Sequence, residues 1–278
     1  MTDDPGGVSS EHPHTGSAGS GHHANPALQT ISFLRGQLDS LEKQVGSALG
    51  QANDEGHHLS QPGWKRRSPG EARPPVAVAV AIAILLQVVL PDRLVFKPTW
   101  LLPVLEAVLL IGLIVSDPRR IERSSVWLRY ASLTLIAIIS IANAFSAVEL
   151  VREIVLGTGP SNPRTLLGSG AAIYLTNIIV FGLWYWELDR GGPVARAQGG
   201  DRHPDFMFVQ MDKTQLASPD WKPLFLDYCW LSYTNATAFS PTDTMPLSRA
   251  AKATMFIQSA VSLVTVALVV ARAVNILK

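Results

Sequence analysis

The sequence predicts an all-α polytopic integral membrane protein with about five transmembrane helices plus a possible re-entrant helix and loop. Hydrophobic residues make up 47% of the chain and charged residues only 16%, and the mean hydropathy is +0.20. The apolar residues are grouped in helix-length blocks, and basic residues stand at the ends of those blocks. Both patterns are typical of membrane helices and their cytoplasmic flanks. The net charge of +1 shows no bias toward nucleic acid, so the lipid bilayer is the expected partner.

Residues 1–74 are predicted to form a cytoplasmic, largely disordered region, because the first 27 or so contain almost no large apolar side chains that could offset chain entropy. No apolar stretch typical of a signal peptide occurs in these residues. Six histidines lie in this region, namely His12, His14, His22, His23, His57 and His58. No cysteines accompany them, and their spacing does not match a closed metal site, so a solvated tail is favoured and no metal or cofactor is predicted.

A short heptad helix is predicted at about residues 28–52. Apolar side chains recur there at alternating spacings of three and four, at Ile31, Leu34, Leu38, Leu41, Val45, Ala48 and Ala52. A helix this short needs packing against a partner to be stable. A self-associating coiled coil and an amphipathic helix on the membrane surface both fit the pattern.

Residues 75–278 are predicted to form the transmembrane domain. Five apolar blocks are interpreted as spans, namely Pro75–Leu90, Trp100–Val115, Trp127–Leu150, Leu166–Trp186 and Ala250–Leu277. Crossing the hydrocarbon core takes about 20 helical residues, with a lower limit near 17. The first two blocks are near that limit, and the turn Pro91-Asp92-Arg93 between them favours a tight helical hairpin.

The basic residues predict orientation in the inner (plasma) membrane. They are most frequent before the first span, between the second and third spans, and after the fourth span, which favours a cytoplasmic amino terminus. The shorter segment Pro223–Ser240 then begins on the cytoplasmic side. If it re-enters, the carboxyl terminus is external; if it crosses, both termini are cytoplasmic. Its polar side chains, such as Asp227 and Asn235, favour re-entry over a lipid-facing span.

The pore-like segment 223–278 contains the candidate site. Hydroxyl and carboxylate side chains are concentrated where the short segment ends, and the pore or filter candidates are Thr234, Thr237, Ser240, Thr242 and Asp243. Pro241 and Pro246 bracket a turn that cannot continue a helix. A pore constriction and a helix-breaking turn with polar caps, in which Asp243 or Ser248 caps the next helix, both agree with this composition.

Three polar residues share one face of the last span, and Gln258, Ser262 and Thr265 are candidates for lining a pore. Small polar residues on one face also mark helix packing in lipid. In the second span Glu106 is an intramembrane carboxylate, which is a functional candidate by default. Pairing with a basic neighbour or snorkelling is the alternative for Glu106.

The segment resembles the pore-loop module of potassium-channel-like cation channels. The aromatic approach of Tyr228, Trp230 and Tyr233 is followed by Thr234, Thr237, Asp243 and Pro246 in the family's order. The resemblance implies a tetrameric cation channel. Phe239, Ser240 and Pro241 stand where the family has Gly-Tyr-Gly, which points to a degenerate filter without a potassium-selective carbonyl cage. The segment also resembles a family of uncharacterised bacterial membrane proteins that has an Asn-Ala-Thr-Ala-Phe-Ser-Pro-Thr-Asp-Thr core.

The sequence contains no nucleophile elbow, zinc-protease motif, phosphate loop or dinucleotide-binding turn, so no enzyme activity and no catalytic residue are predicted. The leading expectation is an oligomeric, weakly selective cation channel, whose partners are lipid, further copies of the chain and monovalent cations. The alternative is a non-conducting membrane scaffold or sensor, in which the polar carboxyl-terminal segment only packs helices.

Overall fold

The computed structural model describes residues 34–47, 61–116, 126–160, 162–238 and 243–277. The chain divides into two units, Met1–His57 and His58–Lys278. In the first unit, residues 34–47 form a helix whose side chains are all exposed. A helix therefore occupies the centre of the expected 28–52 segment, and its self-association stays a prediction. The six histidines of the tail lie outside the described residues.

The second unit is helical apart from one two-residue strand pair, within its described residues. Its elements are η1 (Gly63–Lys65), α2 (Pro74–Val89), η2 (Asp92–Leu94), α3 (Leu101–Ser116), α4 (Val126–Leu156), α5 (Pro163–Leu188), η3 (Asp189–Gly191), α6 (Pro193–Ala197), β1 (Phe206–Met207), α7 (Val209–Asp212), η4 (Thr214–Leu216), α8 (Phe225–Ala238), β2 (Met245–Pro246) and α9 (Arg249–Leu277). β1 and β2 pair antiparallel, with Phe206 opposite Pro246.

Three of these helices, α4, α5 and α9, are long and apolar enough to cross a membrane. Helices α2 and α3 each have 16 residues, which corresponds to about 24 Å against a hydrocarbon core of about 30 Å. The expected membrane character is therefore supported, whereas the count of five spans is not established. The short segment expected at 223–240 is the 14-residue helix α8.

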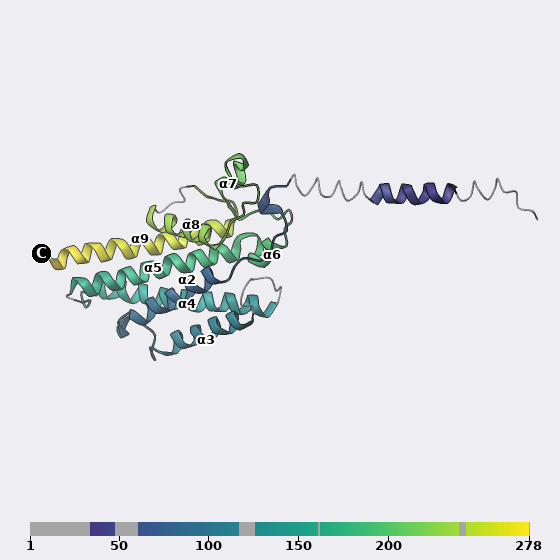
Figure 1. Cartoon of the computed structure of the whole chain (residues 1–278). Helices are drawn as coiled ribbons and strands as arrows, with labels where there is room; N and C mark the ends of the chain where they lie inside the picture. Colours follow the sequence, from purple (N-terminus) through teal and green to yellow (C-terminus); the bar gives the residue numbers. More distant parts are fainter. Residues whose placement is uncertain (1–33, 48–60, 117–125, 161, 239–242, 278) are drawn as a thin grey trace, which may run out of the picture. The chain divides into compact units, whose positions relative to one another are not determined.

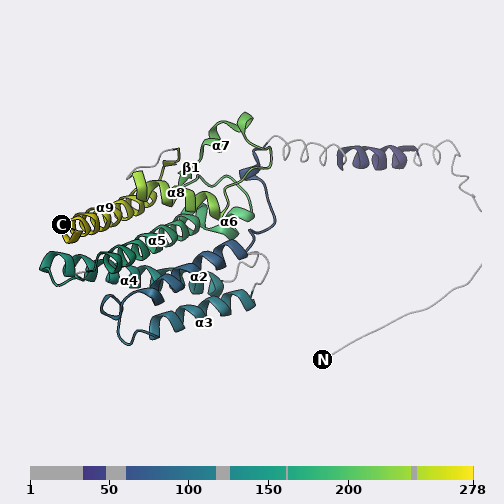
Figure 2. The same ribbon diagram turned by 60° about the vertical axis from the view of Figure 1, so that its left-hand side comes forward.

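Consecutive long helices run antiparallel, and Figures 1 and 2 show α2, α3, α4, α5 and α9 side by side. Three contacts bring the start of α2, the end of α3, the start of α4 and the end of α5 together. Trp186 Nε1 donates to Glu71 Oε2 (2.7 Å), Arg73 donates to the carbonyl of Leu113, and Ser132 donates to Glu187 Oε1 (3.0 Å). We call this end of the unit, which includes Glu71, Trp186 and Asp189, the polar end.

Helix α5 is central and approaches two neighbours closely through glycines. A Cβ at Gly170 would lie 2.9 Å from both γ carbons of Val269 on α9, and a Cβ at Gly182 would lie 3.2 Å from the Cα and Sγ of Cys229 on α8. No side chain fits at Gly170 without displacing Val269, so both glycines set the distances between helices.

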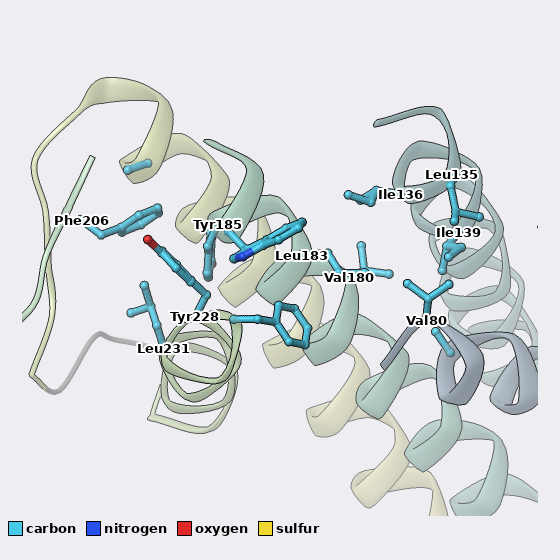
Figure 3. Close-up of a cluster of buried hydrophobic side chains, with 14 of the residues drawn as sticks. Val80, Leu135, Ile136, Ile139, Val180, Leu183, Tyr185, Phe206, Tyr228 and Leu231 are labelled. Carbon is cyan, nitrogen blue, oxygen red and sulfur yellow. The ribbon is translucent and has the colours of Figure 1, made fainter. Parts of the chain in front are cut away.

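The buried apolar residues form two clusters. One lies toward the polar end, and Figure 3 shows its aromatic part, Tyr185, Phe206 and Tyr228, from α5, β1 and α8. In the same view Val80, Leu135, Ile136 and Ile139 pack between α2 and α4. The second cluster lies at the opposite end and consists of Leu90, Leu94, Ala147, Leu150, Leu166, Ala172, Ile173, Val269 and Ala273.

After α5 the chain reverses through three consecutive residues with positive φ, Arg190 (φ 52°), Gly191 (φ 82°) and Gly192 (φ 97°). Glycine adopts these angles readily, whereas arginine does so at a cost of about 1 kcal/mol. Arg190 is held by its amide, which donates to Asp205 Oδ2 (2.9 Å), and by its guanidinium, which donates to the carbonyl of Trp64 (2.6 Å) and to Asp189 Oδ2 (3.5 Å). The reversal therefore keeps the chain at the polar end.

Candidate functional site

Helix α8 enters the bundle from the polar end and runs antiparallel to α5. At its start, the Phe225 ring packs edge-on against Trp186, with centroids 5.9 Å apart. Further along, Ser232 Oγ donates to the carbonyl of Ile178 (2.6 Å), and Thr237 Oγ1 lies 3.3 Å from the hydroxyl of Tyr174. Later residues of α8 thus meet earlier residues of α5.

Helix α9 also runs antiparallel to α5, because Ser262 Oγ accepts from Asn177 Nδ2 (3.0 Å) while Val269 lies against Gly170. Helices α8 and α9 are therefore parallel and both begin at the polar end. Strand β2 is at that end too, since it pairs with β1 and the amide of Leu247 donates to the carbonyl of Asp205 (2.8 Å).

The chain thus runs inward along α8 and is back at the same end by Met245. Fourteen helical residues extend about 21 Å, which is less than the thickness of the hydrocarbon core. A 14-residue helix and a membrane-length helix therefore both begin at the polar end, and residues 239–242 between them lie outside the described residues.

The predicted pore residues lie in different surroundings. Thr234 is buried and donates to the carbonyl of Leu231 (3.0 Å). Thr237 is exposed and donates to the carbonyl of Tyr233 (2.7 Å), and Asp243 is exposed beside Thr244. Ser240 and Thr242 lie outside the described residues.

The cap of α9 is Ser248, whose Oγ accepts from the amide of Ala251 (3.1 Å). Ser248, one of the two residues expected to cap α9, therefore makes the capping hydrogen bond. The other, Asp243, is exposed and precedes the helix by six residues. Its Oδ1 accepts from the hydroxyl of Thr244 (3.4 Å).

A polar seam of Ser232, Asn235, Gln258, Ser259 and Tyr185 joins α8, α9 and α5. Gln258 Nε2 donates to Ser232 Oγ (2.7 Å) and to its carbonyl (3.0 Å). Gln258 Oε1 accepts from Asn235 Nδ2 (2.8 Å) and from the hydroxyl of Tyr185. Ser259 donates to Asn235 Oδ1 (3.2 Å). The nitrogen and the oxygen of the Gln258 amide are thus both hydrogen-bonded to groups of the same chain.

The face of α9 that was expected to line a pore is buried inside the helical bundle. Gln258, Ser262 and Thr265 are 0%, 1% and 3% exposed. Their partners Ser232, on α8, and Asn177, on α5, were not among the predicted site residues. Ser232 and Asn235 occupy adjacent turns of α8, so helical periodicity could have pointed to them. Lining a path between chains with Gln258, Ser262 and Thr265 would require these internal contacts to open.

Glu106 is fully buried between α3 and α2 and accepts from Gln87 Nε2 (3.3 Å). Within the described residues, Glu106 Oε2 and Gln87 Oε1 have no hydrogen-bond partner. Because Glu106 is fully buried, its carboxylate does not snorkel toward the membrane surface. Its hydrogen-bond partner is Gln87, where a basic residue was the expected partner. The pair ties the two short apolar helices together.

A network of buried charged residues lies at the polar end, next to the start of α8. Asp189 is fully buried and accepts from the hydroxyl of Tyr228 (2.6 Å) and from the amide of Asp205 (2.9 Å). Arg196 donates to the carbonyls of Trp186 and Asp189, so its charge offsets the negative end of the α5 dipole. The network sets the position of the α8 start relative to α5.

Comparison of the chain with protein-family models, with curated proteins and with solved structures gave no match. The resemblance to the pore-loop module of cation channels stays a prediction.

Proposed function

We propose that copies of this chain assemble in the membrane around a weakly selective pathway for monovalent cations. In this proposal each copy contributes α8 and the segment that returns from it. The observation that supports it is that α8 and α9 are parallel and both begin at the polar end, and that β2, which lies between them in the chain, is also at that end. This is the order of parts in a pore module, where a half-helix leads to a loop before the last span.

The exposed face of α8 supports contact with a neighbouring copy. Leu226, Trp230 and Tyr233 lie along one side of the helix and are 68%, 55% and 46% exposed. The rings of Trp230 and Tyr233 lie 5.7 Å apart, and the exposed Thr237 continues the same face. Such an aromatic face on a half-helix fits against another protein surface.

Weak selectivity follows from residue chemistry. A cage of inward carbonyls needs alternating left-handed backbone angles, and Phe239 and Pro241 disfavour them. Asp243 attracts cations through its charge, and charge alone distinguishes poorly between monovalent cations.

The polar seam favours a second candidate, a non-conducting scaffold or sensor. Gln258 and Asn235 are bonded inside one chain, which explains their polarity by helix packing without a pore. The two candidates differ in whether the exposed Asp243 and Thr237 affect conduction.

The test is ion flux through purified full-length protein in planar bilayers. We expect the wild type to pass a cation current. Asp243→Asn should lower this current several-fold, because the negative charge at the entrance of the proposed pathway is lost. We expect Thr237→Val to lower the current as well and to cost about 1 kcal/mol of stability, because its hydroxyl donates to the carbonyl of Tyr233 and also contacts the hydroxyl of Tyr174 on α5.

The matched control is Asp201→Asn, which removes an exposed carboxylate paired with Lys65 at the polar end. This variant should conduct like the wild type. Bilayers that contain folded oligomer but pass no current would refute the channel and favour the scaffold. If Asp201→Asn lowered the current as much as Asp243→Asn does, the effect of Asp243 would be one of surface charge and not of a pore residue.

A further inference from the structure

An open cavity of about 570 Å³ lies between α2, α3, α4 and α5 at the polar end. The segment from Gly191 to Gln198, which includes α6, lines one side of it. Its volume is within the range of small-molecule sites, about 300–1,000 Å³. The cavity lies apart from α8 and the returning segment and has no part in the proposed conduction pathway.

The lining has two chemically distinct parts. Toward the interior it is apolar, with Val80, Leu110, Leu135 and Leu183 among its residues. These come from four different helices, so the apolar part extends between them. An empty apolar space of this size would leave those side chains without packing partners.

The other part is charged. Arg73, Arg129 and Arg202 line it together with Glu187, so three positive charges and one negative charge leave a formal excess of two positive charges. Arg129 and Arg202 are exposed, whereas Glu187 is buried and accepts from Ser132 (3.0 Å).

The two arginines have donors to offer a ligand. Arg202 Nη1 donates to the carbonyl of Arg190 (3.3 Å), and the guanidinium carries five N–H donors in total. Planar guanidinium groups bind phosphate through paired hydrogen bonds. Because both arginines line the cavity, a phosphate held there would meet guanidinium donors.

The depth of the charged part fits a molecule of the bilayer. Arg73 immediately precedes α2, and Arg202 donates to the carbonyl of Arg190, two residues after the end of α5, so both lie at the ends of apolar helices. Basic pockets between transmembrane helices on the cytoplasmic side are suited to anionic headgroups. The basic flanks of the sequence predict that this end is cytoplasmic.

We propose that this cavity binds an anionic phospholipid. Its phosphate lies between Arg129 and Arg202, and one acyl chain occupies the apolar space between α2, α3, α4 and α5. The bound lipid supplies the packing that the short helices α2 and α3 lack along this space.

The experiment uses the full chain, delipidated in detergent, with phosphatidylglycerol or phosphatidylcholine of the same acyl chains added. Lipid retention is followed by native mass spectrometry and stability by the melting temperature. We expect phosphatidylglycerol to be retained and to raise the melting temperature, and Arg129→Gln with Arg202→Gln to weaken its binding by about tenfold or more.

Two further variants complete the design. Arg164→Gln removes an exposed arginine at the start of α5, away from the polar end, and should bind phosphatidylglycerol like the wild type. Leu110→Trp, which fills the apolar part, should lower retention while every arginine is intact. Equal retention of phosphatidylcholine, binding unaffected by the arginine pair, or protection by inorganic phosphate alone would each overturn the proposal.

Discussion

Asp189, the first residue after α5, helps to fix the position of the candidate site. Its buried carboxylate accepts from Tyr228 on α8, from the amide of Asp205 before β1, and from Arg190 Nε at 3.5 Å. A buried carboxylate costs several kcal/mol unless it is paired and hydrogen-bonded. Because Tyr228 and Asp205 belong to two segments distant from Asp189 in the chain, the positions of these segments are coupled through a single side chain.

Glu71, just before α2, predicts a pH dependence of stability. Burial raises the pKa of its carboxyl group above the ordinary value of 4.5, although Trp186 and the amide of Phe225 donate to it and Arg196 and Lys222 lie near. The folded protein therefore holds this proton more tightly than the unfolded chain does. The resulting stability is complete below about pH 4.5 and is lost as pH rises through the raised pKa.

The measurement is the melting temperature in detergent between about pH 4 and pH 8. Glu71→Gln is neutral throughout and should flatten the fall of melting temperature with rising pH. Asp201→Asn, which changes an exposed carboxylate, should leave the slope as it is in the wild type. Identical slopes for the wild type and Glu71→Gln would contradict this role of Glu71.

At the scale of elements, the docking of α8 on α5 depends on the absence of a side chain at Gly182. The Cα and Sγ of Cys229 lie 3.2 Å from where a Cβ would be. Gly182→Val should therefore push α8 away, at a cost of about 1–3 kcal/mol for overpacking. Cys229 is the single cysteine of the chain, so its thiol reports on this movement.

We expect maleimide to label Cys229 about tenfold faster in Gly182→Val than in the wild type, which corresponds to about 1.4 kcal/mol. Gly168→Val is the matched control on the same helix, since among the described residues no atom beyond its own turn of helix lies within 4 Å of its Cβ position. Equal labelling rates in the two variants would mean that Gly182 has no special role in docking α8.

The helix bounds could be predicted from sequence because they depend on local signals. The expected spans differ from the helices by at most six residues at either end, and α2 and α5 begin at Pro74 and Pro163, where proline suits a first helical turn. The number of crossings could not be predicted in the same way. Blocks such as Pro75–Leu90 are close to the length limit, where composition alone does not decide.

At the scale of the whole molecule, the start of α2 and the end of α9 lie at opposite ends of the second unit. Glu71 contacts Trp186 at the polar end, and Ala273 packs with Leu166 in the cluster at the other end. If the helices cross the membrane, reporters before Pro75 and in the loop 191–221 should be on one side and a reporter after Lys278 on the other.

Glycosylation or cysteine-accessibility mapping in intact cells checks this arrangement. The basic flanks predict that the first two reporters are cytoplasmic. A carboxyl terminus on the same side as the loop 191–221 would require α8 to cross the membrane, and it would remove the re-entrant arrangement on which the proposed pore depends.

The sequence by itself determined the apolar helical segments and their approximate bounds, because hydropathy, proline and polar side chains act over neighbouring residues. Only the tertiary structure decided which polar groups meet. The face that Gln258 presents depends on the rotation of α9 against α5, which the contact between Gly170 and Val269 controls. Residues as far apart as Arg73, Arg129 and Arg202 line one cavity because antiparallel packing brings the ends of separate helices together. No local pattern encodes that proximity.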